Sequence, residues 1–135
     1  MLVRPLPVPD VESAPFWEGC KQSRLLIQRC GDHFQFPPTS YCTRCNSRAP
    51  QWYEASGRGL VYSWIVVHVP IPREIYGSQV PYITALVDLA EGPRLCTNLI
   101  EVSPNDVRAG MLVEVTFQAV GDGTFSLPFF RPVNQ

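Results

Sequence analysis

The most informative part of the sequence is a pair of short motifs, Cys30-Gly31-Asp32-His33 and, eight residues further on, Cys42-Thr43-Arg44-Cys45. In each motif two good metal ligands are separated by two residues, a spacing that lets both side chains of a tight turn face one ion. Asp32 is a harder ligand and is less well placed than His33. The motifs predict a closed, structural zinc site, and the alternative is a metal-free loop whose cysteines are simply small and buried. The predicted ligands are Cys30, His33, Cys42 and Cys45.

The residues around the two motifs indicate a short β-hairpin. The apolar stretch 25–30 enters the first motif as a strand, and Phe34-Gln35-Phe36-Pro37-Pro38 leads on toward the second. Two cysteine-bearing turns beside a short hairpin are the layout of a zinc ribbon. Further toward the N-terminus, Asp10 can cap a short helix that ends near Lys21. Its apolar face, formed by Phe16, Trp17 and Cys20, is expected to pack within the chain or against a partner.

Residues 55–135 have the pattern of a β-barrel. Segments rich in β-branched and aromatic residues are separated by turn sequences, and Ser103-Pro104 begins a short helix after the third segment. Five strands with a helix in this place follow the order of an OB-fold. The predicted strands are 60–69, 82–89, 94–100, 111–120 and 124–130. The predicted fold class is therefore mainly β, with an N-terminal extended and helical segment (1–23), a rubredoxin-like zinc ribbon (24–54) and a C-terminal five-stranded OB-fold barrel (55–135).

Composition and charge narrow the range of functions. The 135 residues carry 11 basic and 12 acidic side chains, and neither sign forms a run. Proteins that bind nucleic acid usually concentrate basic residues, because neutralising phosphates supplies most of the affinity. The sequence shows neither a signal peptide nor an apolar run long enough to cross a bilayer. We therefore expect a cytoplasmic protein whose cysteines stay reduced and serve metal or thiol roles.

Motifs of independent catalysis are missing from the sequence. It contains no GxSxG elbow, phosphate loop or dinucleotide fingerprint. A nucleophilic Cys–His pair would need Cys20 or Cys96 near His68, and the spacing does not demand it. Cys96 lies in a predicted strand and is expected in the core, whereas His68 is expected to be a structural or loop residue. The sequence thus predicts no catalytic residue in this chain.

A series of short elements runs through nearly the whole chain in a specific order: Phe16-Trp17, Leu26-Ile27-Gln28-Arg29-Cys30, Phe36-Pro37-Pro38, Cys42-Thr43-Arg44-Cys45, Ser56-Gly57-Arg58-Gly59-Leu60-Val61-Tyr62-Ser63, Val80-Pro81-Tyr82, Ala109-Gly110-Met111-Leu112-Val113 and Leu127-Pro128-Phe129-Phe130. Together they resemble the zinc-ribbon and OB-fold acyl-CoA-associated proteins known as domain of unknown function 35. Two positions depart from that family. His33 stands where a cysteine is usual, and Thr39 stands where an arginine commonly follows the Phe-Pro-Pro element. Imidazole binds zinc well, so the first change is expected to preserve the site.

The resemblance implies a role beside an enzyme. Members of the family accompany thiolase-like enzymes in steroid side-chain degradation, ketone synthesis and related acyl-CoA pathways, and some pair with hotdog-fold hydratases. The partner supplies the nucleophile and acid–base groups. The resemblance therefore predicts a non-catalytic accessory subunit that stabilises an acyl-CoA-processing enzyme and helps shape its acyl-CoA site. Because adjacent strand residues point to opposite faces, one of Phe129 and Phe130 is expected to reach the partner.

Two other functions fit parts of the sequence. A free-standing acyl-CoA-binding protein would need cations for the coenzyme A phosphates, and Arg58, Arg73 and Arg94 are available on turns and loops. A single-stranded nucleic-acid binder would need exposed aromatic rings on the barrel. Tyr62 and Trp64, two residues apart on the first barrel strand, could share such a face. The scattered basic residues do not favour this second function.

Overall fold

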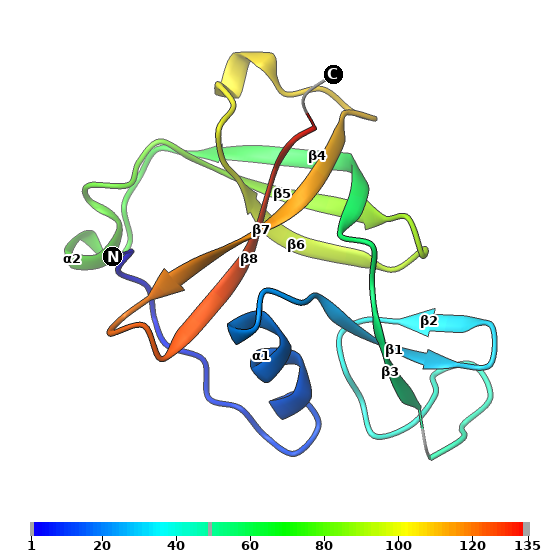
Figure 1. The fold of residues 1–135 in the computed structure, drawn as a ribbon. Helices are drawn as coiled ribbons and strands as arrows, with labels where there is room; N and C mark the ends of the chain where they lie inside the picture. Colours follow the sequence, from blue (N-terminus) through cyan, green and yellow to red (C-terminus); the bar gives the residue numbers. More distant parts are fainter. Residues whose placement is uncertain (1, 49, 134–135) are drawn as a thin grey trace.

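The computed structural model describes residues 2–48 and 50–133, which form a β-barrel and a small three-stranded ribbon with a short helix between them (Figure 1). In chain order the elements are α1 (Ala14–Lys21), β1 (Leu26–Cys30), β2 (His33–Gln35), β3 (Gln51–Glu54), β4 (Arg58–Val67), α2 (Arg73–Tyr76), β5 (Tyr82–Leu89), β6 (Arg94–Leu99), the 3-10 helix η1 (Pro104–Asp106), β7 (Leu112–Val120) and β8 (Phe125–Pro132). The predicted mainly β fold with a five-stranded barrel is confirmed. The short helix α2 was not predicted, because its segment reads as an irregular loop.

The barrel is closed, with the strands in the order β4-β5-β6-β8-β7. Antiparallel pairing joins β4 to β5, β5 to β6 and β7 to β8 over most of their lengths. The two remaining strand pairings are shorter. Strand β4 pairs with β7 over Arg58–Leu60, and β6 pairs with β8 in parallel at Leu99 and Phe130. Alternate side chains point inward, so Ile83 and Val87 of β5 are buried with Phe130 in the core.

A β-bulge in β4 decides which aromatic side chains reach the surface. Val61 pairs with Val87 and Ser63 pairs with Leu86, so Tyr62 is the extra residue in the strand. Tyr62 is exposed, whereas Trp64 packs against the core. The expectation that Tyr62 and Trp64 share a face is therefore wrong. The two rings cannot form one stacking platform for bases.

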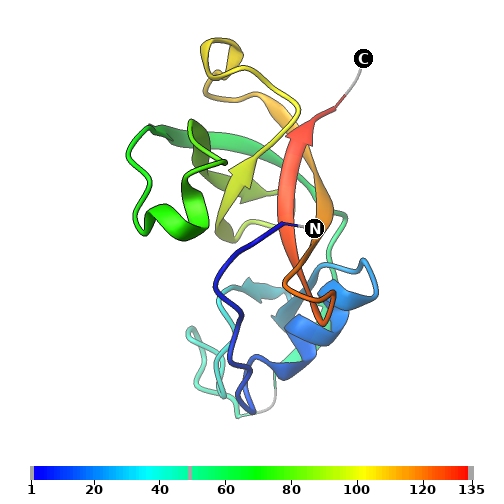
Figure 2. The ribbon, with the colours of Figure 1, turned by 90° about the vertical axis from the view of Figure 1, so that its left-hand side faces the viewer.

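Helix α1 packs against both the ribbon and the barrel (Figures 1 and 2). Phe16 and Cys20 are buried in the same cluster as the ribbon and barrel residues. The Phe16 ring centroid lies 5.2 Å from that of Phe36 in the ribbon loop, and the Trp17 ring centroid lies 6.4 Å from that of Phe125 in β8. The helix face thus packs within the chain, which was one of the two expected alternatives.

The start of α1 differs from the prediction. The helix begins at Ala14, and its N-cap residue is Ser13 rather than Asp10. Asp10 lies in the preceding turn, where its carboxylate accepts a 2.7 Å hydrogen bond from the Ser13 backbone N–H group. The hydrogen bond from the Ser13 side chain, and after it this backbone bond, lower the pKa of Asp10. Asp10 therefore stabilises the turn that leads into the helix.

Phe129 and Phe130 point to opposite faces of β8, and both are buried. Phe130 lies in the barrel core, whereas Phe129 is covered from outside by the N-terminal segment. The Arg4 guanidinium carbon lies 5.4 Å from the centroid of the Phe129 ring. The prediction that one of these rings reaches a partner is therefore wrong for the folded chain. The chain's own first residues occupy that position.

Candidate metal centre

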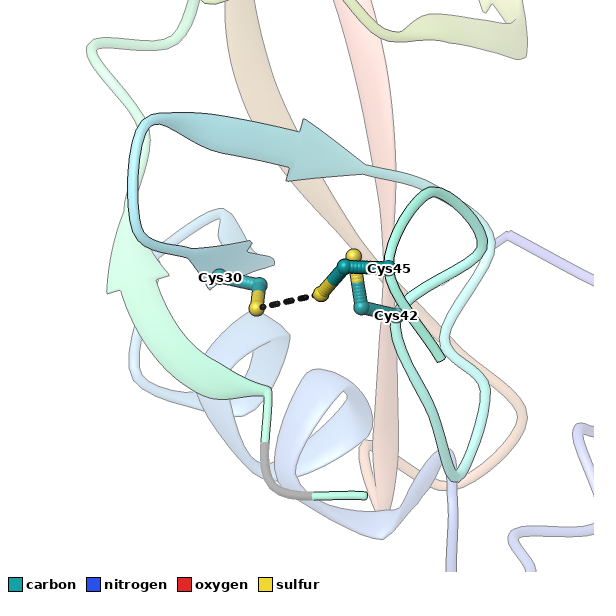
Figure 3. Close-up of side chains that lie close together, drawn as sticks. All are labelled: Cys30, Cys42 and Cys45. Carbon is teal, nitrogen blue, oxygen red and sulfur yellow. Dashed lines mark hydrogen bonds between the residues drawn. The ribbon is translucent and has the colours of Figure 1, made fainter. Parts of the chain in front are cut away.

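Three cysteine side chains from the two predicted motifs lie together at one end of the ribbon (Figure 3). The sulfur atoms of Cys30, Cys42 and Cys45 all lie within 4.8 Å of one another. The distance between the Cys30 and Cys45 sulfur atoms is 3.5 Å. Zinc with Zn–S bonds of about 2.3 Å and tetrahedral angles separates its sulfur ligands by about 3.8 Å. The three thiols therefore fit a zinc ion.

The first motif is a two-residue hairpin between β1 and β2. Gly31 has a φ of +61°, a left-handed conformation that glycine adopts easily, and it lets the chain reverse within two residues. Cys30 and His33 are register partners across this hairpin, so their side chains leave the same face of the ribbon. The hairpin thus places Cys30 and His33 on the side of the ribbon where Cys42 and Cys45 lie.

His33 is beside the thiol cluster and is turned toward the second motif. Its Nδ1 atom lies 3.2 Å from Nη1 of Arg44 and 3.6 Å from the Asp32 carboxylate. A guanidinium group only donates hydrogen bonds, so Nδ1 of His33 accepts from Arg44. The group of side chains within 4.8 Å of one another contains the three cysteines and does not contain His33.

The second motif is a tight turn with its backbone N–H groups aimed at a sulfur atom. The Cys42 backbone N–H group donates to Ser47, and the Asn46 backbone N–H group donates to Cys42. Hydrogen bonds from the backbone N–H groups of Cys45 and Arg44 lower the pKa of the Cys42 thiol. Without metal, the contact with the Cys45 side chain raises the pKa of Cys30 to about 11. The turn therefore stabilises Cys42 in the thiolate form that binds metal.

A buried amide holds the loop that carries the second motif. Gln28 of β1 is buried, and its side-chain N–H donates to the Thr39 carbonyl over 2.7 Å. The Gln28 side-chain oxygen accepts from the Thr39 backbone N–H at 2.9 Å and from the Gln35 side chain at 2.7 Å. Thr39, one of the two departures from the family pattern, is thus fixed through its backbone. These bonds position the chain just before Cys42.

The other residues singled out by sequence do not form a reactive site. Cys20 lies on the buried face of α1, and desolvation raises the pKa of its thiol to about 12, so it is not a nucleophile. Cys96 was expected in the core and is exposed, because the inward positions of β6 fall on its neighbours. His68 is exposed just after β4. Arg94 is held by Asp88 at 2.7 Å and lies over the Tyr62 ring, so it is not a free cation.

Sequence reasoning missed Arg4, the residue that fixes the N-terminal segment to the barrel. Its side chain donates to Gln79 and Asn98, both at 2.8 Å. Its partners lie more than seventy residues away in the sequence, at separations of 75 and 94. No local pattern around Arg4 signals these contacts.

As for membranes, no helix in the described ranges has the length and apolar character that spanning a bilayer requires.

Two family models match adjacent parts of the chain. Residues 17–51 match the model described as ChsH2, rubredoxin-like zinc ribbon domain. Residues 52–118 match the model described as ChsH2, C-terminal OB-fold domain. These matches confirm the predicted ribbon and OB-fold. Together with the clustered thiols, they identify structural zinc as the metal of the ribbon.

Similar proteins include both short and long chains. A DUF35 domain-containing scaffold protein of Methanocaldococcus jannaschii is 32% identical over 127 residues, covering 87% of this chain and 88% of that protein. A "Probable enoyl-CoA hydratase alpha subunit" of Thermomonospora curvata is 40% identical over 132 residues, covering 96% of this chain. The present chain spans only 40% of the length of that subunit.

Among solved structures, a chain of the "Ltp2-ChsH2(DUF35) aldolase" superimposes with a TM-score of 0.84 at 39% identity. The match covers 94% of this chain and 98% of that chain. The likeness extends across the ribbon, α1 and the barrel together. The present chain, a ChsH2-type zinc ribbon followed by a ChsH2-type OB-fold domain, therefore belongs to the DUF35 family.

Proposed function

We propose that this chain is a non-catalytic accessory subunit of an acyl-CoA-processing enzyme, which it stabilises and whose acyl-CoA site it helps to shape. The observation that carries the proposal is the match, over 94% of this chain and 98% of the other, to a chain of a solved structure named an aldolase. The similarity to a named hydratase alpha subunit supports the same class of partner. The proposed partner is a thiolase-like or hotdog-fold hydratase-like subunit, in cytoplasmic lipid or steroid metabolism.

We further propose that His33 completes a Cys₃His zinc site with the three clustered cysteines. The proposed domain bounds are 1–23 for the N-terminal segment, 24–54 for the ribbon and 55–135 for the OB-fold barrel. The register pairing of Cys30 with His33 supports this ligand set, because both side chains leave one face. When bound, such a zinc supplies a structural cross-link with no open position for water activation.

An apolar patch on the outer face of the barrel is the surface proposed to contact the enzyme. Leu60 of β4 and Leu112 of β7 are register partners and are 48% and 40% exposed. Ile65, further along β4, is 62% exposed, whereas the Arg94 guanidinium covers one face of the exposed Tyr62 ring between them in the strand. Exposed apolar residues that gather in this way are typical of protein interfaces.

The proposal is tested by affinity purification of the tagged chain from the lysate of its own organism, with identification of co-purifying proteins and zinc analysis. A stoichiometric thiolase-like, aldolase-like or hydratase-like enzyme is the expected result. The enzyme's activity should fall when the chain is removed and return when it is added. Recovery of acyl-CoA or nucleic acid with no enzyme would instead support one of the two other functions.

The patch is tested with the double variant Leu60→Asp and Ile65→Asp. Placing two carboxylates in an apolar interface should weaken the complex at least about a hundredfold, because an unpaired charge is costly to bury. Val11→Asp is the matched control, since Val11 is also exposed and apolar but lies in the turn before α1. Equal effects of the two changes on the complex would rule out the patch as the contact surface.

A further inference from the structure

A cleft of about 380 Å³ lies on the outside of the barrel, where the N-terminal segment, α1 and the ribbon loop meet strands β5, β6 and β8. Its volume lies in the lower part of the range of about 300–1,000 Å³ typical of small-molecule sites. We call it the Arg4 cleft. Its walls are formed by Arg4, Phe16, Trp17, Phe36, Thr84, residues 95–98 and residues 127–129.

Most of the wall is apolar. Three aromatic rings, those of Phe16, Trp17 and Phe36, face the barrel side chains across the cleft. The polar residues of the wall are mostly occupied within the fold. The Thr97 hydroxyl donates to the Pro128 carbonyl at 2.8 Å, and the Asn98 side-chain N–H donates to the Ile83 carbonyl at 3.1 Å. The interior of the cleft therefore suits an apolar body.

Arg4 is the one charged residue of the wall, and its partners are all neutral. The guanidinium carbon lies 5.0–5.4 Å from the ring centroids of Tyr76, Tyr82 and Phe129. Nε donates to the Gln79 side-chain oxygen and Nη1 donates to that of Asn98. Within residues 2–48 and 50–133, no carboxylate forms an ion pair with Arg4, and Nη2 has no hydrogen-bond partner.

A half-buried cation without a counter-ion is unusual, because removing a charge from water is costly unless an opposite charge accompanies it. The aromatic rings offset part of this cost. The hydrogen bonds of Nε and Nη1 hold the guanidinium in place and leave Nη2 for an incoming acceptor. Arg4 thus presents one positive charge beside an apolar cleft, and the described part of the chain supplies no anion to neutralise it.

We propose that the Arg4 cleft binds a small apolar carboxylate, with the carboxylate at Nη2 of Arg4 and the apolar body between α1 and β6. A single guanidinium matches a singly charged, planar carboxylate. A phosphate group or the several phosphates of coenzyme A would need further cations, which this wall does not supply. The site lies wholly within this chain, so it does not depend on the proposed partner enzyme.

The test uses the zinc-loaded full chain and two probes of equal length, decanoate and decanol. Each probe is titrated by calorimetry and by the fluorescence of the tryptophans, one of which, Trp17, lines the cleft. Decanoate should bind with one site per chain and at least about tenfold more tightly than decanol, the difference expected for one charge-assisted contact. Equal binding of the two probes, or binding of neither, would overturn the proposal.

Cys96 locates the bound probe, because it is exposed and lines the cleft. Alkylation of Cys96, followed by peptide mass spectrometry, should be slowed by saturating decanoate. Arg4→Gln is the control, in which the same concentration of decanoate should slow the alkylation of Cys96 less. Decanoate that binds without protecting Cys96 would be bound elsewhere, and the assignment of the cleft would be wrong.

Arg4→Gln should weaken decanoate binding at least about tenfold and leave decanol binding within about twofold, since only the charge is removed. Arg73→Gln is the control, because it removes the same charge from an exposed position on α2 outside the cleft. Should Arg4→Gln alter the fold, Cys96→Phe fills the cleft from the barrel side and should abolish decanoate binding. Decanoate binding that survives Cys96→Phe unchanged would overturn the proposal.

Discussion

The barrel and the ribbon of this chain are stabilised by different means. The barrel buries residues from all five of its strands against one another, in a cluster that continues into α1 and the start of the ribbon. In the ribbon, by contrast, the buried apolar side chains of residues 24–48 and 50–54 are Leu25, Ile27 and Cys42. A segment this short cannot bury enough apolar surface to fold alone. It instead combines a metal centre at one end with packing on α1 at the other. The barrel thus contributes most of the buried core, and the ribbon depends on it and on the metal centre.

Loss of the metal should separate the two regions most strongly. Cys42→Ser removes the buried ligand, and structural zinc contributes on the order of 10–16 kcal/mol to the folding of small ribbon modules. Hydrogen exchange should show loss of protection across β1, β2 and β3, while β4 to β8 remain protected. A chelator should reproduce the effect in the wild type. Cys96→Ser is the control and should change neither region, because Cys96 is exposed and distant from the metal motifs in sequence.

A cavity in the barrel core should instead unfold the whole chain. Phe130 is fully buried, and Phe130→Ala should cost about 3–5 kcal/mol. Because α1 joins the ribbon to β8, the ribbon should lose its support in the same transition. Guanidinium denaturation, followed by circular dichroism and tryptophan fluorescence, measures the loss. Phe34→Ala, at a half-buried ring of the ribbon, should cost less, and a ribbon that outlasts the barrel would contradict this dependence.

The link between the two regions is sensitive to a single methyl group. Gly57, between β3 and β4, has a φ of +81°, and a Cβ atom there would lie 2.6 Å from Cγ1 of Val115. Gly57→Ala should therefore cost about 1–3 kcal/mol for the backbone, with the clash adding to this. Gly110→Ala separates the two contributions, since Gly110 has a φ of +82° and no atom within 4 Å of its added Cβ. Thermal denaturation should rank Gly57→Ala as the less stable variant.

The smallest effect concerns an ion pair on the outer face of the barrel. The hydrogen bond from Arg94 lowers the pKa of Asp88 below its ordinary value of 3.8. The contribution of this ion pair to the free energy of unfolding is therefore complete above the ordinary pKa that Asp88 has in the unfolded state. It is lost as the pH falls through the lower pKa of the folded state. Asp88→Asn should flatten the acid limb of the stability curve below about pH 4. The effect should be small, because both side chains are partly exposed. An unchanged acid limb would show that the pair adds nothing.

The sequence pattern predicted strands better than it predicted which way their side chains face. The predicted strand 82–89 coincides with β5, where four buried apolar residues alternate with positions that, apart from Leu86, carry a polar group. In β6 the pattern gave the strand but the face of Cys96 was predicted wrongly, because cysteine is most often buried; the charged Arg94, two residues earlier, marks the outward face. The bulge at Tyr62 has no local signature, and inserting one residue reverses the faces of everything beyond it.

The metal centre was more predictable than the cleft, because its ligands lie in two short motifs. Spacing alone indicated the three cysteines that the fold brings together, and it also indicated His33, whose role as fourth ligand stays a prediction. The Arg4 cleft depends on packing between segments nearly a hundred residues apart. Only the folded chain brings Arg4 to Asn98, and no spacing rule relates such distant positions.

The strand pairings of the barrel differ in length, and this difference has a consequence for the order in which the chain folds. The β4-β5-β6 meander and the β7-β8 hairpin pair strands that are neighbours in the sequence, so each can form by closing a short loop. Bringing β7 to β4 and β8 to β6 requires closing much longer loops for few hydrogen bonds. Long-range pairing of this kind slows folding. We therefore expect barrel closure to limit the folding rate, with the meander and the hairpin formed before it.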